Sequence, residues 1–233
     1  VQAARSAGIR NISLDLMLAL EGQTPASVQA SAGEAARLGA RHVSAYLLKI
    51  EEGTPYFARR GSLALPDEDA QADLYLTACE ALEEQGYRQY EISNFSLPGF
   101  ASRHNLKYWN LEPYLGIGPS AHSYLGGRRF AYPRDLSGFL RGEEPEAERD
   151  AADLTANSIP EGGEEEYILL RLRLAEGVSE AAFQRRFGRS LPAIYRQRAA
   201  VLPSSLVTVD ENGIRFTREG FLLSNPLTAR LLG

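Results

Sequence analysis

The chain has 233 residues, a formal net charge of −5 and 44% hydrophobic residues, which is an ordinary composition for a globular protein. Its length allows one large domain, or one medium and one small domain. No apolar run approaches the roughly 18 residues of a membrane span. The single cysteine, Cys79, excludes internal disulfides and cysteine-rich metal sites built by this chain alone. It fits the reducing cytoplasm, which is the compartment we expect.

The first residues predict the end of a helix. Residues 1–7 read as the last helical turns, and Gly8 is in the place of a C-cap glycine. A strand follows directly. We therefore expect that this sequence is a fragment of a longer protein and that an upstream part is missing.

Residues 11–93 predict alternating strands and helices. Strands are expected at 11–18, 42–50 and 89–93, the first of them buried on both faces. Helices are expected at 26–38, with Thr24 as N-cap, and at 67–85, with Cys79 as a buried thiol; residues 51–66 are expected to form an irregular loop. This order predicts a parallel sheet with right-handed crossovers, about half of an α/β barrel, in a domain that covers residues 1–141.

The last third of the chain predicts a second, smaller domain at 164–233, joined by an acidic linker at 142–163. Helices are expected at 164–174, after the N-cap Ser179 and at 191–201. A hairpin turns at Asn212-Gly213, and one last helix starts at Thr217. This pattern resembles a winged-helix module. Ten arginines against eight acids give residues 164–233 a net charge of only +2, so we expect a structural module and no nucleic-acid partner.

Residues 103–124 carry the densest chemistry of the sequence. They hold two of the three histidines, the only tryptophan and a Gly-x-Gly turn. Histidine is the commonest metal ligand, aromatic rings give flat apolar surface, and glycine allows close approach of a ligand. These residues predict a pocket for a large, flat ligand that can contain a metal, with His104 in a polar loop facing it. The alternative is a structural role, with His104 bonded to backbone, Trp109 in the core and the glycines in a tight turn.

Two charged residues lie in or after the expected strands. Asp15 interrupts an apolar strand, where a buried carboxylate would need a partner, either a ligand or a neighbouring arginine. Lys49 lies at the carboxyl end of the next strand, where α/β folds bind their ligands.

Several motifs occur in the same order as in a known family. They are Ile12-Ser13-Leu14-Asp15-Leu16-Met17, Gly22-Gln23-Thr24, Ser44-Ala45-Tyr46, Ile50-Glu51-Glu52-Gly53-Thr54-Pro55, Tyr90-Glu91-Ile92-Ser93-Asn94-Phe95 and the run over 103–124. In this combination the chain resembles the HemW family, haem chaperones formerly grouped with the oxygen-independent coproporphyrinogen III oxidases of the radical SAM superfamily.

The resemblance implies an α/β fold: the C-terminal part of a partial (β/α)6 radical SAM barrel, followed by a small helical, winged-helix-like domain. It also implies haem as the bound group, with a [4Fe-4S] cluster and S-adenosylmethionine in the full-length protein. The family's cluster motif, Cys-x3-Cys-x2-Cys, is not in this sequence. A cluster requires cysteine thiolates, so the fragment by itself is expected to bind none and to carry no catalytic residue.

The resemblance also suggests roles for six residues. Asp15, Lys49 (through its backbone) and His122 match the wall that contacts S-adenosylmethionine. His104, Tyr108 and Trp109 match the His-Asn-x-x-Tyr-Trp motif that is tied to haem in the family. His104 is the expected ligand of the haem iron.

Two functions compete on this resemblance. One is a haem chaperone that transfers haem to acceptor proteins, membrane-associated acceptors included. The other is an oxygen-independent coproporphyrinogen III oxidase, an enzyme of porphyrin biosynthesis. The oxidases typically carry a different sequence at 104–109, which favours the chaperone. A DNA-binding regulator acting through residues 164–233 is the weakest of the three readings.

Overall fold

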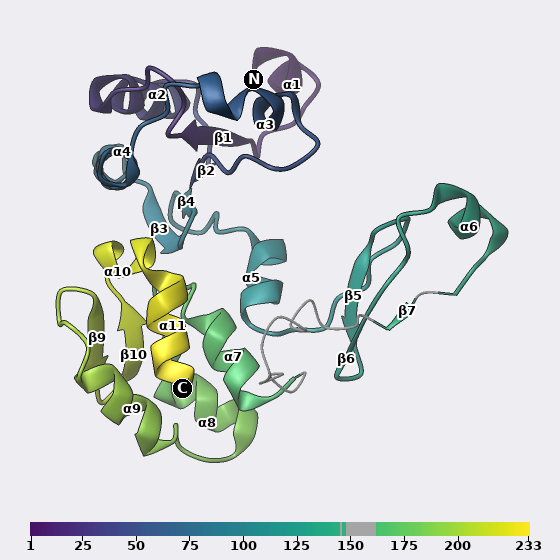
Figure 1. Ribbon diagram of the computed structural model, residues 1–233, viewed down its shortest axis with the longest axis vertical. Helices are drawn as coiled ribbons and strands as arrows, with labels where there is room; N and C mark the ends of the chain where they lie inside the picture. The colour runs from purple at the N-terminus through teal and green to yellow at the C-terminus, as the bar shows by residue number, and fades with distance from the viewer. Residues whose placement is uncertain (145, 148–161) are drawn as a thin grey trace. The chain divides into compact units, whose positions relative to one another are not determined.

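The computed structural model describes residues 1–144, 146–147 and 162–233 (Figure 1). The chain divides into two compact units, each described by itself below. Unit 1 comprises Val1–Ser102 with Thr217–Leu223, and unit 2 comprises Arg103–Phe216 with Ser224–Gly233. Most of the acidic linker predicted at 142–163 lies outside the described residues.

Unit 1 is an α/β unit. Its elements are α1 (Gln2–Ser6), β1 (Ser13–Leu18), α2 (Pro25–Arg37), β2 (His42–Leu47), α3 (Pro55–Arg59), a 3-10 turn (Arg60–Ser62), α4 (Glu68–Glu84), β3 (Arg88–Glu91), β4 (Asn94–Ser96) and α10 (Arg218–Leu222). The loop predicted at 51–66 is therefore partly helical. Thr54 starts α3 by accepting a hydrogen bond from the Phe57 amide, and Pro55 fits its first turn.

The two long helices of unit 1 begin where the sequence predicts. The Thr24 hydroxyl caps α2 by accepting from the Ser27 amide, and Asp67 caps α4 in the same way. α2 and α4 pack on each other and cover one face of the sheet (Figure 1). Cys79 is fully buried in α4, as predicted, and its burial raises the pKa of the thiol to about 12.

The sheet of unit 1 is mixed, with strand order β1-β2-β4-β3. β1 and β2 are parallel, as predicted. β4 then inserts between β2 and β3 and runs antiparallel to both. The prediction of an all-parallel sheet is wrong at this point, because a tight β3–β4 hairpin takes the position next to β2 and no crossover helix is needed there.

The prediction that β1 is buried on both faces is also wrong. Its residues alternate, with Ser13, Asp15 and Met17 exposed, because α2 and α4 cover only the other face of the sheet. Asp15 is therefore an exposed carboxylate, and the expected penalty for burying it does not arise. Ser44 of the neighbouring strand β2 pairs with Asp15 and therefore lies on the same face of the sheet.

One histidine of β2 is buried between side chains of β1 and β3. His42 is 7% exposed; its Nδ1 lies 2.7 Å from the Ser13 hydroxyl and its Nε2 lies 2.8 Å from the Tyr90 hydroxyl. Burial lowers the pKa of His42, and the nearby Asp15 carboxylate raises it in part. The fold therefore favours the neutral imidazole, with one ring nitrogen donating and the other accepting.

This arrangement predicts that unit 1 loses stability in mild acid. The pKa of His42 is higher in the unfolded state than in the fold, so the unfolded state binds a proton first as the pH falls below about 6.5. The folded state therefore loses stability relative to the unfolded state until the pH reaches the lower pKa of folded His42. The slope is at most about 1.4 kcal/mol per pH unit. Hydrogen exchange of the β2 amides between pH 7.5 and 5 measures it. His42→Gln should remove this component, and an unchanged pH dependence in the variant would contradict the assignment.

Unit 2 holds the remaining elements. They are α5 (Arg103–Trp109), β5 (His122–Leu125), β6 (Arg128–Ala131), α6 (Leu136–Arg141), β7 (Glu146–Ala147), α7 (Glu164–Arg171), β8 (Val178–Ser179), α8 (Glu180–Phe187), α9 (Ala193–Ala200), β9 (Val207–Asp210), β10 (Gly213–Phe216) and α11 (Ser224–Leu232). Two antiparallel sheets result, of order β5-β6-β7 and β8-β10-β9. His104, predicted in a loop, lies in α5. The single last helix is in fact two, α10 and α11.

The C-terminal part of unit 2 contains helices and a hairpin that the sequence predicts there, whereas α10, expected in the same module, belongs to unit 1. Ser179 caps α8, and β9 and β10 form the hairpin with Asp210 paired to Gly213. The rings of Tyr167, Phe183 and Phe187 pack against one another in the core. Across the residues that the structure describes, no helix has both the length and the apolar character needed to cross a membrane.

Candidate functional site

The helix α5 brings His104 and Tyr108 of the predicted haem motif together. His104 and Tyr108 are four residues apart and therefore share one face of the helix. The His104 Nε2 lies 3.0 Å from the Tyr108 hydroxyl, and the two rings meet edge to face with centroids 5.0 Å apart. His104 is exposed, so its imidazole is accessible to a ligand. Of its two ring nitrogens, Nε2 is the one that Tyr108 contacts.

Beside this pair lies a cavity of about 410 Å³, which we call the aromatic cavity. Its lining residues are Tyr108, Trp109, Leu111, Tyr114, Leu170 and Arg129. The ring of Tyr108 packs on that of Tyr114 with centroids 4.5 Å apart, which continues the aromatic surface away from His104. The volume is in the usual range for small-molecule sites, and flat apolar walls suit a planar ligand.

Trp109 leaves a polar atom without a partner at this cavity. Its indole Nε1 is buried and has no hydrogen-bond acceptor among the described residues. The Arg173 guanidinium lies over the ring, 4.7 Å from its centroid, which is a cation–π contact. A buried donor without an acceptor is destabilising, so this position favours a ligand or water that accepts a hydrogen bond.

One cation borders the aromatic cavity, and an acid of α7 already neutralises it. Arg129 forms a 2.5 Å ion pair with Glu166 and donates a 2.9 Å hydrogen bond to the Tyr114 hydroxyl. Glu166 also accepts from the Gly162 amide. These contacts hold β6, α7 and the Tyr114 ring in place around the cavity.

The Gly-x-Gly segment is explained by close backbone packing. A Cβ on Gly116 would lie 2.3 Å from the His122 carbonyl oxygen, so only glycine fits against β5 there. Gly118 has a φ of +117°, which also favours glycine. His122 starts β5, is exposed and belongs to the same unit as the aromatic cavity, but it does not line that cavity.

Asp15 and Lys49 belong to unit 1 and the other four predicted residues to unit 2. Within unit 1, Lys49 follows β2 and forms an exposed 2.9 Å ion pair with Glu51. The structure thus places Tyr108 and Trp109 in the lining of the aromatic cavity, while His104 contacts Tyr108 but does not line the cavity itself. Leu111, Tyr114, Arg129 and Leu170 complete the cavity; the sequence analysis assigned none of them a role, and Arg129 and Leu170 carry no local signal that could have done so.

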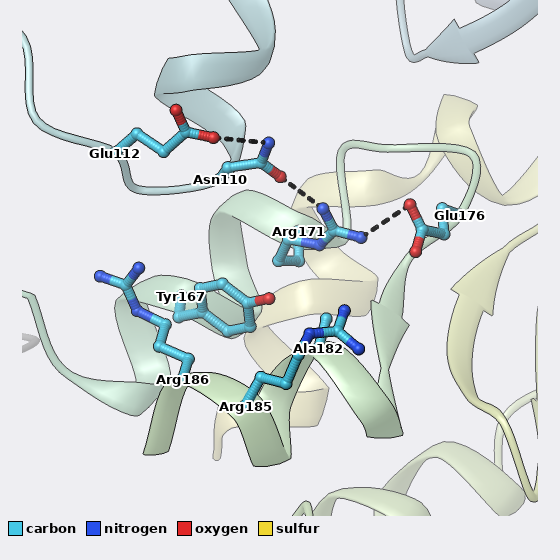
Figure 2. Close-up of a pocket in the computed structure, with 8 residues that line it drawn as sticks. All are labelled: Asn110, Glu112, Tyr167, Arg171, Glu176, Ala182, Arg185 and Arg186. Carbon is cyan, nitrogen blue, oxygen red and sulfur yellow. Dashed lines mark hydrogen bonds and ion pairs between the residues drawn. The ribbon is translucent and has the colours of Figure 1, made fainter. Parts of the chain in front are cut away.

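A second cavity of unit 2 is lined largely by charged side chains (Figure 2). Asn110, the residue after Trp109, donates to Glu112 and accepts from Arg171 of α7. The sequence analysis did not anticipate this cavity.

Comparison with known proteins agrees with these observations. The family described as the HemN C-terminal domain matches residues 165–223. A protein named "Heme chaperone HemW" from Bacillus subtilis is 36% identical over all of this chain, and its namesake from Lactococcus lactis is 35% identical over all of it. Over its whole length, the chain is similar in sequence to the HemW family. It spans 62% and 61% of the lengths of these two relatives.

The fold comparison confirms the fold class that was predicted. The solved structure described as "Coproporphyrinogen III oxidase (HemN) from Escherichia coli is a Radical SAM enzyme" matches 99% of this chain with a TM-score of 0.66, at 21% identity and over 56% of its own length. HemW from Escherichia coli is 31% identical over 96% of this chain. This chain therefore has the α/β fold of the HemN structure, and its residues 165–223 match the HemN C-terminal domain.

The residues present do not fit an iron–sulfur cluster. Cluster iron is held by cysteine thiolates, and Cys79, the single cysteine of the sequence, is enclosed in α4 with a pKa raised by burial to about 12. No group of three or more histidine, cysteine or acidic side chains suited to a metal occurs in the described part of the chain.

Proposed function

We propose that this chain forms the haem-binding part of a cytoplasmic haem chaperone. The observation that carries the proposal is the pairing of His104 with Tyr108 on α5, next to a 410 Å³ cavity with aromatic walls. A histidine nitrogen is a natural axial ligand of haem iron, and aromatic rings provide a flat apolar surface for the macrocycle.

The Tyr108 contact decides which nitrogen of His104 can bind iron. If Nε2–H donates to the Tyr108 hydroxyl, Nδ1 carries the free lone pair and faces an incoming iron. If Tyr108 donates to Nε2, the tyrosine must turn away before Nε2 can bind. Either way, Tyr108 acts as a positioning residue, and the buried Trp109 Nε1 can donate to a ligand in the cavity.

The other bound groups belong to the longer protein. Asp15, Lys49 and His122 are the proposed contacts of S-adenosylmethionine, and the cluster ligands would come from outside this chain. The proposed partners are haem-accepting proteins, to which the bound haem is transferred. The principal alternative is an oxygen-independent coproporphyrinogen III oxidase, a class to which the HemN protein of similar fold belongs by its description.

Titration of the chain with ferric haem tests the proposal. We expect saturable one-to-one binding with the Soret band of a histidine-ligated haem, followed by loss of that band when an apo-haem protein is added. Haem that binds without saturation, or that does not leave for an acceptor, contradicts the chaperone. Decarboxylation of coproporphyrinogen III by the longer protein would instead support the oxidase.

A further inference from the structure

The second cavity of unit 2, which we call the arginine pocket, has a volume of about 450 Å³ and shares no residue with the aromatic cavity. It is lined by Asn110, Glu112, Tyr167, Arg171, Glu176, Ala182, Arg185 and Arg186 (Figure 2). Three arginines face two acids, so the lining has an excess of one positive charge.

Arg171 is the buried cation of the arginine pocket. It is only 5% exposed; its Nε donates a 3.0 Å hydrogen bond to the Gly177 carbonyl, and Nη1 donates to the Asn110 side chain. The third nitrogen, Nη2, is buried and has no hydrogen-bond acceptor among the described residues. It lies 3.1 Å from the Glu176 carboxylate, whose side chain is 67% exposed. The charge of the buried Arg171 guanidinium is thus balanced by one carboxylate, which is itself largely solvated by water.

The other two arginines have no acidic partner. Arg185 and Arg186 come from α8, and neither forms an ion pair within the part of the chain that the structure describes. Arg186 donates to the Leu111 carbonyl at 3.2 Å and lies over the Tyr167 ring, 5.3 Å from its centroid. In Figure 2 the Tyr167 hydroxyl points into the space between Arg171 and Arg185.

We propose that the arginine pocket binds a small molecule through its carboxylate or phosphate group, which takes the place of Glu176 on Arg171. Guanidinium groups bind both oxyanions with paired hydrogen bonds. Nη2 of Arg171, which forms the ion pair with Glu176 but no hydrogen bond among the described residues, is the donor that they would take over. The pocket is much larger than one oxyanion, so it has room for the rest of the ligand.

Glu176 acts in this arrangement as a built-in competitor. Its carboxylate occupies the buried arginine in the absence of ligand and moves into solvent when the anion enters, a small displacement for a side chain that is mostly exposed. Neutralising Glu176 should therefore strengthen anion binding, whereas a purely structural ion pair would only lose stability.

Arginine Nε–H resonances of the whole chain, followed by NMR during titration, test the proposal. With inorganic phosphate or succinate as probe, we expect saturable shifts of Arg171 and Arg185. Glu176→Gln should tighten binding about fivefold, and Arg185→Gln should weaken it about fivefold. Arg230→Gln, which removes an exposed arginine of α11, is the matched control and should leave the affinity unchanged.

The two probes distinguish the ligand group, since tighter binding of phosphate indicates a phosphorylated ligand and tighter binding of succinate a carboxylate. The proposal is overturned if the shifts rise linearly without saturation, or if Arg185→Gln and Arg230→Gln weaken binding equally. Weaker binding in Glu176→Gln would also overturn it. None of these variants removes Arg171, so the core contacts of unit 2 stay in place.

Discussion

Replacing His104 by alanine is expected to lower the affinity of the chain for ferric haem at least about tenfold and to shift its Soret band. The imidazole is the proposed axial ligand. Removing a residue that hydrogen-bonds to a metal ligand typically lowers metal affinity ten- to a hundredfold, and removing the ligand itself is expected to lower it at least as much. His104 is exposed on α5 and its ring meets that of Tyr108 edge to face, so its removal is expected to leave the fold intact. Absorbance titration and the reduced-minus-oxidised spectrum measure the effect.

Two matched variants make this result specific. Tyr108→Phe keeps the aromatic wall and removes the hydroxyl that lies 3.0 Å from Nε2, so it should retain histidine ligation with a changed affinity. His122→Ala removes the other exposed histidine and should leave the Soret band unchanged. If His122→Ala abolishes the band and His104→Ala does not, the iron ligand is assigned to the wrong histidine.

Gly213→Ala is expected to destabilise unit 2 by about 3 kcal/mol or more, a large share of the 5–15 kcal/mol that holds a typical domain. Gly213 has a φ of +151°, which side chains rarely adopt, and a Cβ there would lie 2.0 Å from the Val178 carbonyl oxygen. Relief would require β8 and β10 to separate, because the obstacle is backbone. Urea unfolding followed by fluorescence of Trp109, the only tryptophan, reports on this unit.

The control for this variant is Gly188→Ala. Gly188 ends α8 with a φ of +72°, and an added Cβ would meet nothing within 4 Å. It should cost only the 1–2 kcal/mol of a left-handed backbone, without a clash. Equal losses for the two glycines would show that close packing against Val178 contributes nothing.

The helix starts and the hairpin could be predicted because their signals are local. Thr24, Ser179 and Thr217 each place a side-chain oxygen within reach of an amide three residues later, whatever the rest of the chain does. The hairpin of β9 and β10 likewise depends on four consecutive residues.

The features of the fold that could not be predicted depend on residues that lie far apart in the sequence. The run of apolar residues in β1 predicted burial on both faces of the strand. Met17 is nevertheless 39% exposed, because no described element covers the face of the sheet on which it lies. The three-residue strand β4 has almost no pattern of its own and forms only because β2 and β3 flank it. Both errors arise from sheet pairing, which local periodicity does not encode.

Only the part of the candidate site that is close in the sequence could be predicted. His104, Tyr108 and Trp109 are close in the sequence and could be grouped directly, although their four-residue spacing already indicated the helix that a loop assignment missed. Arg129 and Leu170 reach the aromatic cavity from β6 and α7. The arginine pocket is similarly assembled from segments that tertiary packing joins.

The division of the chain has a consequence for its synthesis. Unit 1 includes Thr217–Leu223, where α10 packs on α4 and Arg218 forms a 2.8 Å ion pair with Glu83. Between Ser102 and this segment the ribosome must add the 114 residues of Arg103–Phe216. At 5–20 residues per second this takes roughly 6–23 s. During that time α4 lacks its contact with α10, so unit 1 can be completed only after most of unit 2 has been synthesised.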